Sequence, residues 1–336
     1  MTKKYQIYGM GNALVDFEIE TTTTKLKELG ITKGVMSLID EEEQDTLHSI
    51  LGKDAHSRAC GGSAANTIIG AQSLGSHCFY SCKVAEDETG HFYKKDLLAC
   101  GVESNLSYQA LQPGKTGKCL VMITDDADRT MNTFLGITGD IDYSQIDESA
   151  LLNSEYLYIE GYLAGSPIAL TGAVKCMHFA RKNHVKTAFS LSDPNIVNFC
   201  GEGLAEIIGE GVNLLFCNED EAKAYSKQDD LQDAITILLK LTEILVITLG
   251  SEGSLIINSN EQIIIEGFQV KAVDTNGAGD LFAGAFLHTI ANGGTLKNAG
   301  ELASYASAQL VTQFGPRLST DNLAVVTKFI KNQELS

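Results

Sequence analysis

Tryptophan is absent from the sequence, and only 4 of its 336 residues are proline. No proline- or serine-rich linker, internal repeat or low-complexity tract interrupts the chain. No apolar run approaches the roughly 20 residues that a helix needs to cross a bilayer. The apolar stretch behind Lys3 and Lys4 is broken by Asn12 and Asp16, so we expect no secretory signal peptide. These absences predict a soluble, cytoplasmic protein whose 44% hydrophobic residues bury a sizeable core.

Cysteine and positive charge are also scarce. The 8 cysteines are scattered, only Cys78 and Cys82 lie close in sequence, and the 7 histidines show no metal-ligand spacing. We therefore expect free thiols in a reducing compartment. With 25 basic against 43 acidic residues, the net charge of −18 argues against nucleic acid or an anionic membrane as a partner. The sequence is compatible with either a monomer or a homodimer.

Apolar runs alternate with helical patterns over most of the chain. Helical spacing covers Ile168–Asn183 and Leu231–Leu241. Continuous apolar runs are typical of strands buried on both faces of a parallel sheet. The predicted strands are Gln6–Gly9, Leu157–Glu160, Thr187–Leu191, Leu214–Cys217, Ile244–Thr248 and Ser254–Asn258. Such alternation predicts βαβ units with helices on both faces of the sheet.

Two segments have a different pattern. In Leu14–Glu20, apolar and acidic residues alternate, and Cys119–Thr124 is joined by a turn to Arg129–Phe134. Period-two alternation predicts strands with one face in water. These segments predict a small accessory sheet, a lid made from separated pieces of chain.

The segment Asp274–Asp280 runs directly into a long apolar stretch that begins at Leu281. Small residues followed by an apolar stretch predict a tight turn that opens a buried helix. The amides of Gly277, Ala278 and Gly279 would then be unpaired first-turn donors. Because such donors add to the positive end of the helix dipole, this turn is predicted to bind an anion.

Asp280 is predicted to lie in the first turn of this helix, beside the anion site. A carboxylate there can accept the proton of an attacking hydroxyl while the amides hold the transferring phosphoryl group. General-base assistance of this kind contributes roughly 10²–10⁴ in rate. The alternative is that Asp280 only caps the helix, because acidic residues favour first turns.

Glycine-rich turns elsewhere provide further candidates. Gly61 and Gly62 permit close backbone approach, and Asn66 offers a donor and an acceptor to a sugar hydroxyl. The segment Gly9–Asp16 partly matches a dinucleotide-binding fingerprint, which would make the protein an oxidoreductase. Leu14 stands where that fingerprint requires glycine, and the following stretch alternates instead of forming a helix.

Polar residues follow two of the predicted strands. Asn218 and Glu221 come after one strand end, where they could hold the water shell of a Mg²⁺ ion. Thr248, Gly250 and Gly253 follow the next strand.

These segments together resemble the ribokinase-like (PfkB) carbohydrate kinases. Asp274–Asp280 closely resembles the second signature of that family, in the wording found in adenosine kinases, and Gly61–Asn66 resembles the first. The resemblance implies a three-layer α/β/α core with a small β-sheet lid, and it runs from residue 5 to about residue 317. It makes Asp280 the catalytic base and Gly277–Gly279 the anion hole.

The same resemblance implies roles for the remaining candidates. Except for Arg129, each role is carried over from the family motif that the residues match. The implied substrate-binding residues are Asn12, Asp16, Gly61, Gly62 and Asn66, with Asp16 on the vicinal hydroxyls of a sugar, and Arg129 is the candidate cation near the phosphates. The implied nucleotide-binding residues are Asn218, Glu221, Thr248, Gly250 and Gly253, with Glu221 reaching the metal through water. ATP and Mg²⁺ are the implied cofactors, and K⁺ is a further candidate.

The sequence therefore predicts one kinase domain with a lid from about residues 13–39 and 103–136. We expect ATP-dependent phosphorylation of the 5′-hydroxymethyl group of adenosine or a related nucleoside, with Phe17 and Met36–Leu38 near the base. A kinase of ribose, fructose or ketodeoxygluconate is the main alternative, because Asp193–Asn195 is similar to a motif of sugar kinases. An oxidoreductase and a catalytically silent ligand-binding relative are the others.

Overall fold

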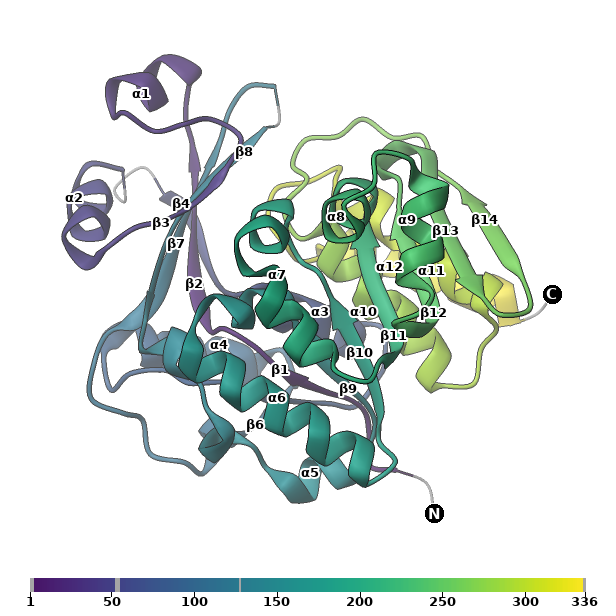
Figure 1. Cartoon of the computed structure of the whole chain (residues 1–336). Helices are drawn as coiled ribbons and strands as arrows, with labels where there is room; N and C mark the ends of the chain where they lie inside the picture. The colour runs from purple at the N-terminus through teal and green to yellow at the C-terminus, as the bar shows by residue number, and fades with distance from the viewer. Residues whose placement is uncertain (1–2, 52–54, 127, 335–336) are drawn as a thin grey trace.

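The computed structural model describes residues 3–51, 55–126 and 128–334. Within these ranges the chain forms two β-sheets, a large one of nine strands and a small one of five (Figure 1). The strands of the large sheet are, in spatial order, β14 (Gln262–Glu266), β13 (Gly253–Asn258), β12 (Thr242–Thr248), β11 (Val212–Asn218), β10 (Lys186–Ser190), β9 (Ser154–Glu160), β1 (Tyr5–Met10), β5 (Cys78–Ser81) and β6 (Glu103–Ser104).

The large sheet is parallel from β12 to β6, and β13 and β14 are antiparallel. Successive side chains of its strands enter two different cores, as Leu215 and Phe216 do on β11. Helices cover both faces (Figure 1). One face is covered by α3 (Ser63–Ser73), α4 (Glu88–Ala99), α10 (Ala278–Ala291), α11 (Leu296–Leu310) and α12 (Thr320–Glu334). The other is covered by α5 (Glu148–Leu152), α6 (Pro167–Lys182), α7 (Pro194–Ile208), α8 (Glu219–Ser226) and α9 (Leu231–Leu238).

The predicted three-layer α/β/α core is confirmed, because every predicted buried strand belongs to the large sheet. The boundaries differ by a few residues. The strand predicted to end at Leu191 ends at Ser190, and α9 ends at Leu238 instead of Leu241. A turn closed by the Leu241 amide on the Leu238 carbonyl ends α9 directly before β12 begins at Thr242.

The small sheet lies apart from the large one and faces its strand ends (Figure 1). The helices α1 (Thr23–Glu28) and α2 (Glu41–Leu51) lie on its outer side. Its strands are, in spatial order, β3 (Met36–Leu38), β8 (Arg129–Gly136), β7 (Thr116–Ile123), β2 (Leu14–Glu20) and β4 (Ala55–Gly61).

The expectation of one wet face for Leu14–Glu20 is wrong. Strand β2 lies between β7 and β4, and both of its faces are covered. Asp16 is only 6% exposed and Glu18 only 5% exposed. On the opposite face, Phe17 packs edge-on against the His48 ring of α2. Alternation therefore separates an apolar outer face from an acidic inner face that is also buried.

The predicted lid ranges are wrong for two strands. The second range began at residue 103, but Glu103–Ser104 forms β6 and pairs with β5 in the large sheet. Strand β4 (Ala55–Gly61) pairs with β2 in the small sheet, although it lies outside both ranges. The alternation signal was absent from this strand, so only the tertiary pairing identifies it.

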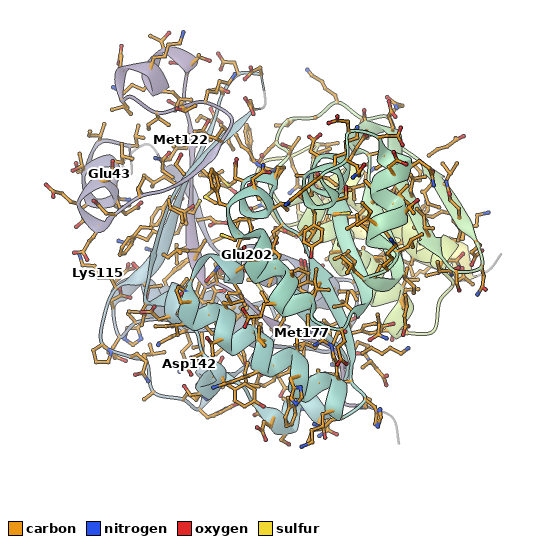
Figure 2. The ribbon with its side chains drawn as sticks, in the orientation of Figure 1. Glu43, Lys115, Met122, Asp142, Met177 and Glu202 are labelled. Carbon is orange, nitrogen blue, oxygen red and sulfur yellow. The ribbon has the colours of Figure 1, made fainter. Side chains whose placement is uncertain are left out.

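The two sheets share their cores with the helices around them. Met122, on β7, belongs to the core that also fills the space under α3 and α10. Met177, on α6, belongs to the core on the other face of the large sheet. Figure 2 labels both methionines among the side chains. Because one core continues from the large sheet to the outer face of the small one, the small sheet is held against the rest of the chain.

Candidate active site

A cavity of about 610 Å³ lies between the small sheet and the C-terminal ends of the large sheet's strands. Ligands of open α/β sheets bind at this edge. The wall contributed by the large domain includes the turn before α10, the N-terminus of α3 and the ends of β11 and β12. The inner face of the small sheet forms the remaining wall. The described residues that line this cavity include every predicted site residue except Gly61.

The N-terminus of α10 opens onto the cavity. Gly277 adopts a positive φ of 73° and precedes the first helical residue, with no side-chain cap. No hydrogen bond from the amide of Gly277 or Gly279 is found within the described residues. The prediction of three free donors is wrong at Ala278, because its amide closes a 3.3 Å turn onto the Thr275 carbonyl. Two unpaired amides and the helix dipole still make this turn electropositive.

Asp280 lies in the first turn of α10 and lines the cavity. The Ser63 hydroxyl donates to one carboxylate oxygen at 2.7 Å, and the Asn66 amide donates to the other at 3.0 Å. Burial raises the pKa of Asp280 above its ordinary value, and these two hydrogen bonds and the charge of Arg129 partly oppose that rise. Asp280 therefore does not cap its helix but is held in place by residues of α3.

Asp16 lines the cavity on the inner face of β2. No hydrogen bond to its carboxylate is found within the described residues. Burial raises the pKa of Asp16 to about 8, and the neighbouring negative charge of Glu18 adds to the rise, while Arg317 opposes it. This side chain is therefore a buried acid whose ionised form would gain from hydrogen-bond donors.

Two buried acceptors share the cavity with Asp16. Asn12 and Asn66 both line the cavity, and the side-chain oxygen of each finds no donor within the described residues. An unpaired buried acceptor costs about 1–3 kcal/mol. Hydroxyl groups of a ligand could supply the missing donors. The Asn66 amide group is already committed to Asp280, which places any such hydroxyl next to that carboxylate.

Gly61 and Gly62 have different functions in this wall. A Cβ at Gly61 would stand 2.0 Å from a carboxylate oxygen of Asp16, so Gly61 makes room for that side chain and does not line the cavity. Gly62 lines the cavity with a φ of 101°, and a Cβ there would lie 2.2 Å from the Asn12 carbonyl oxygen. Both positions therefore require glycine.

The predicted nucleotide residues lie at the ends of neighbouring strands. Asn218 ends β11 and caps α8, and Thr248 ends β12. Gly250 and Gly253 flank a single 3₁₀ turn, and all of these residues line the cavity. Gly253 has a φ of 104°, and a Cβ there would lie 1.9 Å from the Ile265 carbonyl oxygen. This position admits no side chain because of the neighbouring strand.

Glu221 forms a reciprocal capping box with Asn218. The Asn218 side chain donates to one carboxylate oxygen of Glu221 at 2.7 Å, and its backbone amide donates to the other at 3.0 Å. Burial raises the pKa of Glu221 to about 7. Among the described residues no group of three or more acidic, histidine or cysteine side chains could hold a metal ion. One or two carboxylates are enough for Mg²⁺ when substrate phosphates supply other ligands, so Glu221 remains a candidate contact for the ion.

Arg129 begins β8 on the small sheet and extends to the turn before α10. Its guanidinium donates to the Thr275 carbonyl oxygen. Among the cavity-lining residues that the structure describes, Arg129 is the only lysine or arginine. The single cation of the site thus comes from the small sheet and contacts the loop that carries the free amides.

The sequence analysis missed Glu160, the last residue of β9. Glu160 is fully buried, and its two carboxylate oxygens accept from the backbone amides of Asn12 at 2.8 Å and Ala64 at 2.6 Å. Burial raises its pKa to about 7, and the two amides oppose the rise. Glu160 therefore ties the loop after β1 to the start of α3. The sequence feature that marked Glu160 was a charged residue at the end of an apolar strand. Ser63 and Tyr162 also line the cavity and were not predicted as site residues.

The dinucleotide-binding interpretation of Gly9–Asp16 is wrong. The residues after Gly11 form strand β2 instead of the helix that this fingerprint requires. Gly11 packs against Glu160, where an added Cβ would meet the carboxylate at 2.9 Å. Phe17, expected near a substrate base, is also excluded from the cavity, because it lies on the outer face of β2. Met36 and Leu38 do line the cavity.

Comparison with known proteins agrees with this geometry. Residues 29–323 match the family described as pfkB family carbohydrate kinase. The chain belongs to the pfkB family carbohydrate kinases, and it is a kinase.

Within that family the chain is adenosine kinase-like. It is 26% identical to the adenosine kinase of Saccharomyces cerevisiae, over 94% of this chain and 97% of the relative. The structure of adenosine kinase from Sinorhizobium meliloti matches with a TM-score of 0.90 and 31% identity, over 97% of this chain and 99% of that chain. A probable sugar kinase from Rhizobium etli matches with a TM-score of 0.91 and 29% identity, over 100% of both chains.

Two glycines of the turn before α10 give a test of the anion site. A Cβ at Gly279 would meet no atom within 4 Å, so Gly279→Ala should leave the melting temperature unchanged. Because that Cβ borders the cavity next to the free amides, we expect kcat/KM to fall about 10–10²-fold. Steady-state kinetics and thermal unfolding measure the two effects.

Gly277→Ala is the matched comparison. Its Cβ would lie 2.8 Å from the Cα of Pro316, at a φ of 73° that strains any other residue. We expect a loss of about 1–3 kcal/mol in the free energy of unfolding as well as lost activity. Equal kinetics of Gly279→Ala and the wild type would show that no anion approaches this turn.

Proposed function

We propose that the chain transfers the γ-phosphoryl group of ATP to the 5′-hydroxymethyl group of adenosine or a related ribonucleoside. The observation that carries this proposal is that Asp280 shares one cavity with an electropositive helix terminus and a set of unpaired acceptors. The cavity is lined by the two free amides and by Asn12, Asp16 and Asn66, and Asn66 donates directly to the Asp280 carboxylate. A phosphoryl donor and a polyhydroxylated acceptor would thus meet at Asp280.

Asp280 acts in this proposal as the general base. It accepts the proton of the attacking 5′-hydroxyl while the oxygen forms its bond to the γ-phosphorus and ADP leaves. Ser63 and Asn66 fix the orientation of the carboxylate through their hydrogen bonds to it. Burial raises the pKa of Asp280, which makes the carboxylate a better proton acceptor.

The amides of Gly277 and Gly279 stabilise the charge on the transferring group. Preorganised donors at a helix terminus do this without reorganising during the reaction. Arg129 adds the positive charge that the acidic chain otherwise lacks at this cavity. Its contact with the Thr275 carbonyl oxygen already places the guanidinium beside the turn.

ATP in this proposal lies over the ends of β11 and β12, against Asn218, Thr248, Gly250 and Gly253. Mg²⁺ supplied with ATP would neutralise the phosphate oxygens. The capping box around Glu221 leaves its carboxylate able to accept hydrogen bonds from the water shell of the ion, in agreement with an outer-sphere role. A requirement for K⁺ would be tested by adding K⁺ to the kinase assay.

The ribose would lie against Asp16. Its carboxylate could accept hydrogen bonds from the two vicinal hydroxyls, or one of these hydroxyls could donate to the unpaired side-chain oxygen of Asn12 instead. Glu160 positions this wall, because it holds the Asn12 backbone and the start of α3.

The inner face of the small sheet favours a nucleoside over a free sugar. Apart from Asp16 and Arg129, this wall is largely apolar. Its other lining side chains are Leu14, Met36, Leu38, Cys119, Val121, Met131, Thr133 and Leu135. A sugar carries a hydroxyl on nearly every carbon and would leave some of them unpaired here. The flat apolar faces of a purine base match such a wall.

The small sheet, formed by β3, β8, β7, β2 and β4, would act as a lid over the cavity. Closure would exclude water and suppress hydrolysis of ATP. The contact between Arg129 and the Thr275 carbonyl oxygen joins the lid to the turn before α10. We also place the protein in the cytoplasm, because 8 free cysteines suit a reducing compartment.

A sugar kinase is the second candidate function. The similarity to a probable sugar kinase from Rhizobium etli favours it. Asp193 caps α7 through the amide of Asn195, and the next residue, Ile196, lines the cavity. This helix could therefore contribute to either kind of acceptor site.

Measurement of ADP release distinguishes the two functions. Adenosine, inosine, guanosine, ribose, fructose and ketodeoxygluconate would each be tested with ATP and Mg²⁺, with and without K⁺. We expect the highest kcat/KM with adenosine, and 5′-deoxyadenosine should inhibit without ADP release because it lacks the acceptor hydroxyl. A higher kcat/KM with a free sugar would establish the second function. No ADP with any acceptor would contradict both.

A further inference from the structure

Two cysteines from different elements meet at one guanidinium group. Cys60 lies near the end of β4, and Cys100 is the C-cap of α4, which packs against β4. Both sulfur atoms contact the guanidinium group of Arg317, which makes the two thiols neighbours. Arg317 donates from one nitrogen to the Cys60 sulfur at 2.7 Å and from another to the Cys100 sulfur at 3.5 Å. Asp96 of α4 pairs with the same guanidinium at 2.9 Å.

The surroundings make the two thiols unequal. The neighbouring Cys60 thiol lowers the pKa of Cys100, and the positive charge of Arg317 lowers it further. The Cys100 thiol in turn raises the pKa of Cys60, as does burial. Cys100 is partly exposed, whereas Cys60 is fully buried. A small oxidant in solution can therefore reach the sulfur that carries more thiolate character.

We propose that Cys60 and Cys100 form a redox-modification site, in which a peroxide oxidises Cys100 and Cys60 then closes a reversible disulfide. The Cys100 thiolate attacks one oxygen of hydrogen peroxide, the O–O bond breaks, and the departing hydroxide leaves as water after taking up a proton. The Cys60 sulfur then attacks the Cys100 sulfenic acid, the S–O bond breaks, and the thiol proton leaves with the hydroxide as water. Two thiols are oxidised and one peroxide is reduced to two waters.

This site adjoins two loops of the cavity. Cys60 directly precedes Gly61, and its carbonyl oxygen accepts from Arg317. Arg317 follows Pro316, which packs on Gly277 before α10. A disulfide would draw the Cys60 sulfur from Arg317 toward α4. We therefore expect the glycine turn after β4 to shift and kinase activity to fall.

The expected loss of activity rests on the proposed kinase function, whereas the disulfide itself does not. The full-length protein would be reduced, desalted, treated with hydrogen peroxide and digested without reductant for mass spectrometry. We expect a peptide linking Cys60 to Cys100 in the wild type, and its loss after addition of a dithiol. At pH 7, alkylation of Cys100 should be roughly tenfold faster than that of Cys200, the other partly exposed cysteine.

Three variants separate the steps. Cys100→Ser should resist peroxide and lose the linked peptide, and Cys60→Ser should trap a sulfenic acid on Cys100 that a dimedone probe labels. Cys200→Ser is the matched control and should form the linked peptide like the wild type. Absence of the linked peptide in the wild type, or a disulfide that involves Cys200 instead, would overturn the proposed site. A linked peptide with unchanged ADP release would overturn the effect on the cavity.

Discussion

Replacing Asp280 by asparagine is expected to lower kcat by about 10²–10⁴-fold, while ATP binding is largely retained. The carboxylate is the proposed proton acceptor, and it shares the cavity with the free amides and the buried acceptors. Asparagine has the same shape, and its amide could pair with the unpaired side-chain oxygen of Asn66 if that side chain rotates. Single-turnover kinetics would measure the phosphoryl-transfer step, and titration calorimetry would measure ATP binding.

Ser63→Ala is the companion variant for this measurement. It removes the 2.7 Å hydrogen bond to Asp280 but keeps the base. We expect a decrease in kcat well below that of Asp280→Asn, because the second hydrogen bond from Asn66 still orients the carboxylate. Turnover of Asp280→Asn at the wild-type rate would reject the proposed mechanism.

Replacing Asp16 by asparagine is expected to raise the KM for adenosine about 10²-fold, with a smaller effect on kcat. Each hydrogen bond to a charged group contributes about 1.5–3 kcal/mol, and the proposal gives this carboxylate two of them. Adenosine and 2′,3′-dideoxyadenosine would be compared in both proteins. If Asp16 holds the vicinal hydroxyls, the variant and the dideoxy substrate lose the same contacts, and their effects will not add. Additive effects would place the ribose elsewhere.

The Asp16 contact also predicts a pH dependence. Burial raises the pKa of Asp16 to about 8, so this side chain is mostly protonated in the free protein at pH 7. The ionised form accepts the two hydroxyls, so kcat/KM should rise as the pH increases toward 8. Asp16→Asn should remove this dependence. Glu18→Gln, on the same face of β2, removes a neighbouring negative charge and should move the midpoint to lower pH.

The same shift has an opposite effect on stability. The unfolded pKa is close to the ordinary value of 3.8, so the folded protein binds more protons between about pH 4 and 8. The contribution of Asp16 to the free energy of unfolding is therefore present below this range and is lost as the pH rises through it. Asp16→Asn should raise the melting temperature at pH 8 while it weakens substrate binding. A lower melting temperature at pH 8 together with weaker substrate binding would indicate a damaged fold.

Much of the fold could be predicted from local pattern. Continuous apolar runs such as Leu214–Cys217 form buried strands of the large sheet, and the run after Leu281 forms a buried helix. The strand pattern arises because parallel strands are buried on both faces, so it can be recognised without knowing which strands are neighbours. The strand β4 was missed, because its sequence shows neither a continuous apolar run nor clear alternation, and only its pairing with β2 defines it.

Part of the candidate site could likewise be predicted from local sequence, and part could not. The glycine-rich turn at Gly277 and the carboxylate of Asp280 are close in sequence, so their geometry follows from a helix terminus. Phe17 could not be placed, because alternation separates two faces without showing which one meets the cavity. The charge of Glu160 at the end of an apolar strand marked it as unusual, but its role was not predictable, because its partners are the backbone amides of Asn12 and Ala64, which are distant in sequence.

The sequence alone determined the elements and the local chemistry: buried strands, a helix that begins at an electropositive turn, and an acid in its first turn. Short-range periodicity and backbone geometry are sufficient for these features. Only the tertiary structure decided that Asp16 on β2 and Arg129 on β8 reach the same cavity as Asp280, and that Cys60 and Cys100 share Arg317. Contacts between residues so distant in sequence depend on how the two sheets pack together, and a local sequence pattern does not predict that packing.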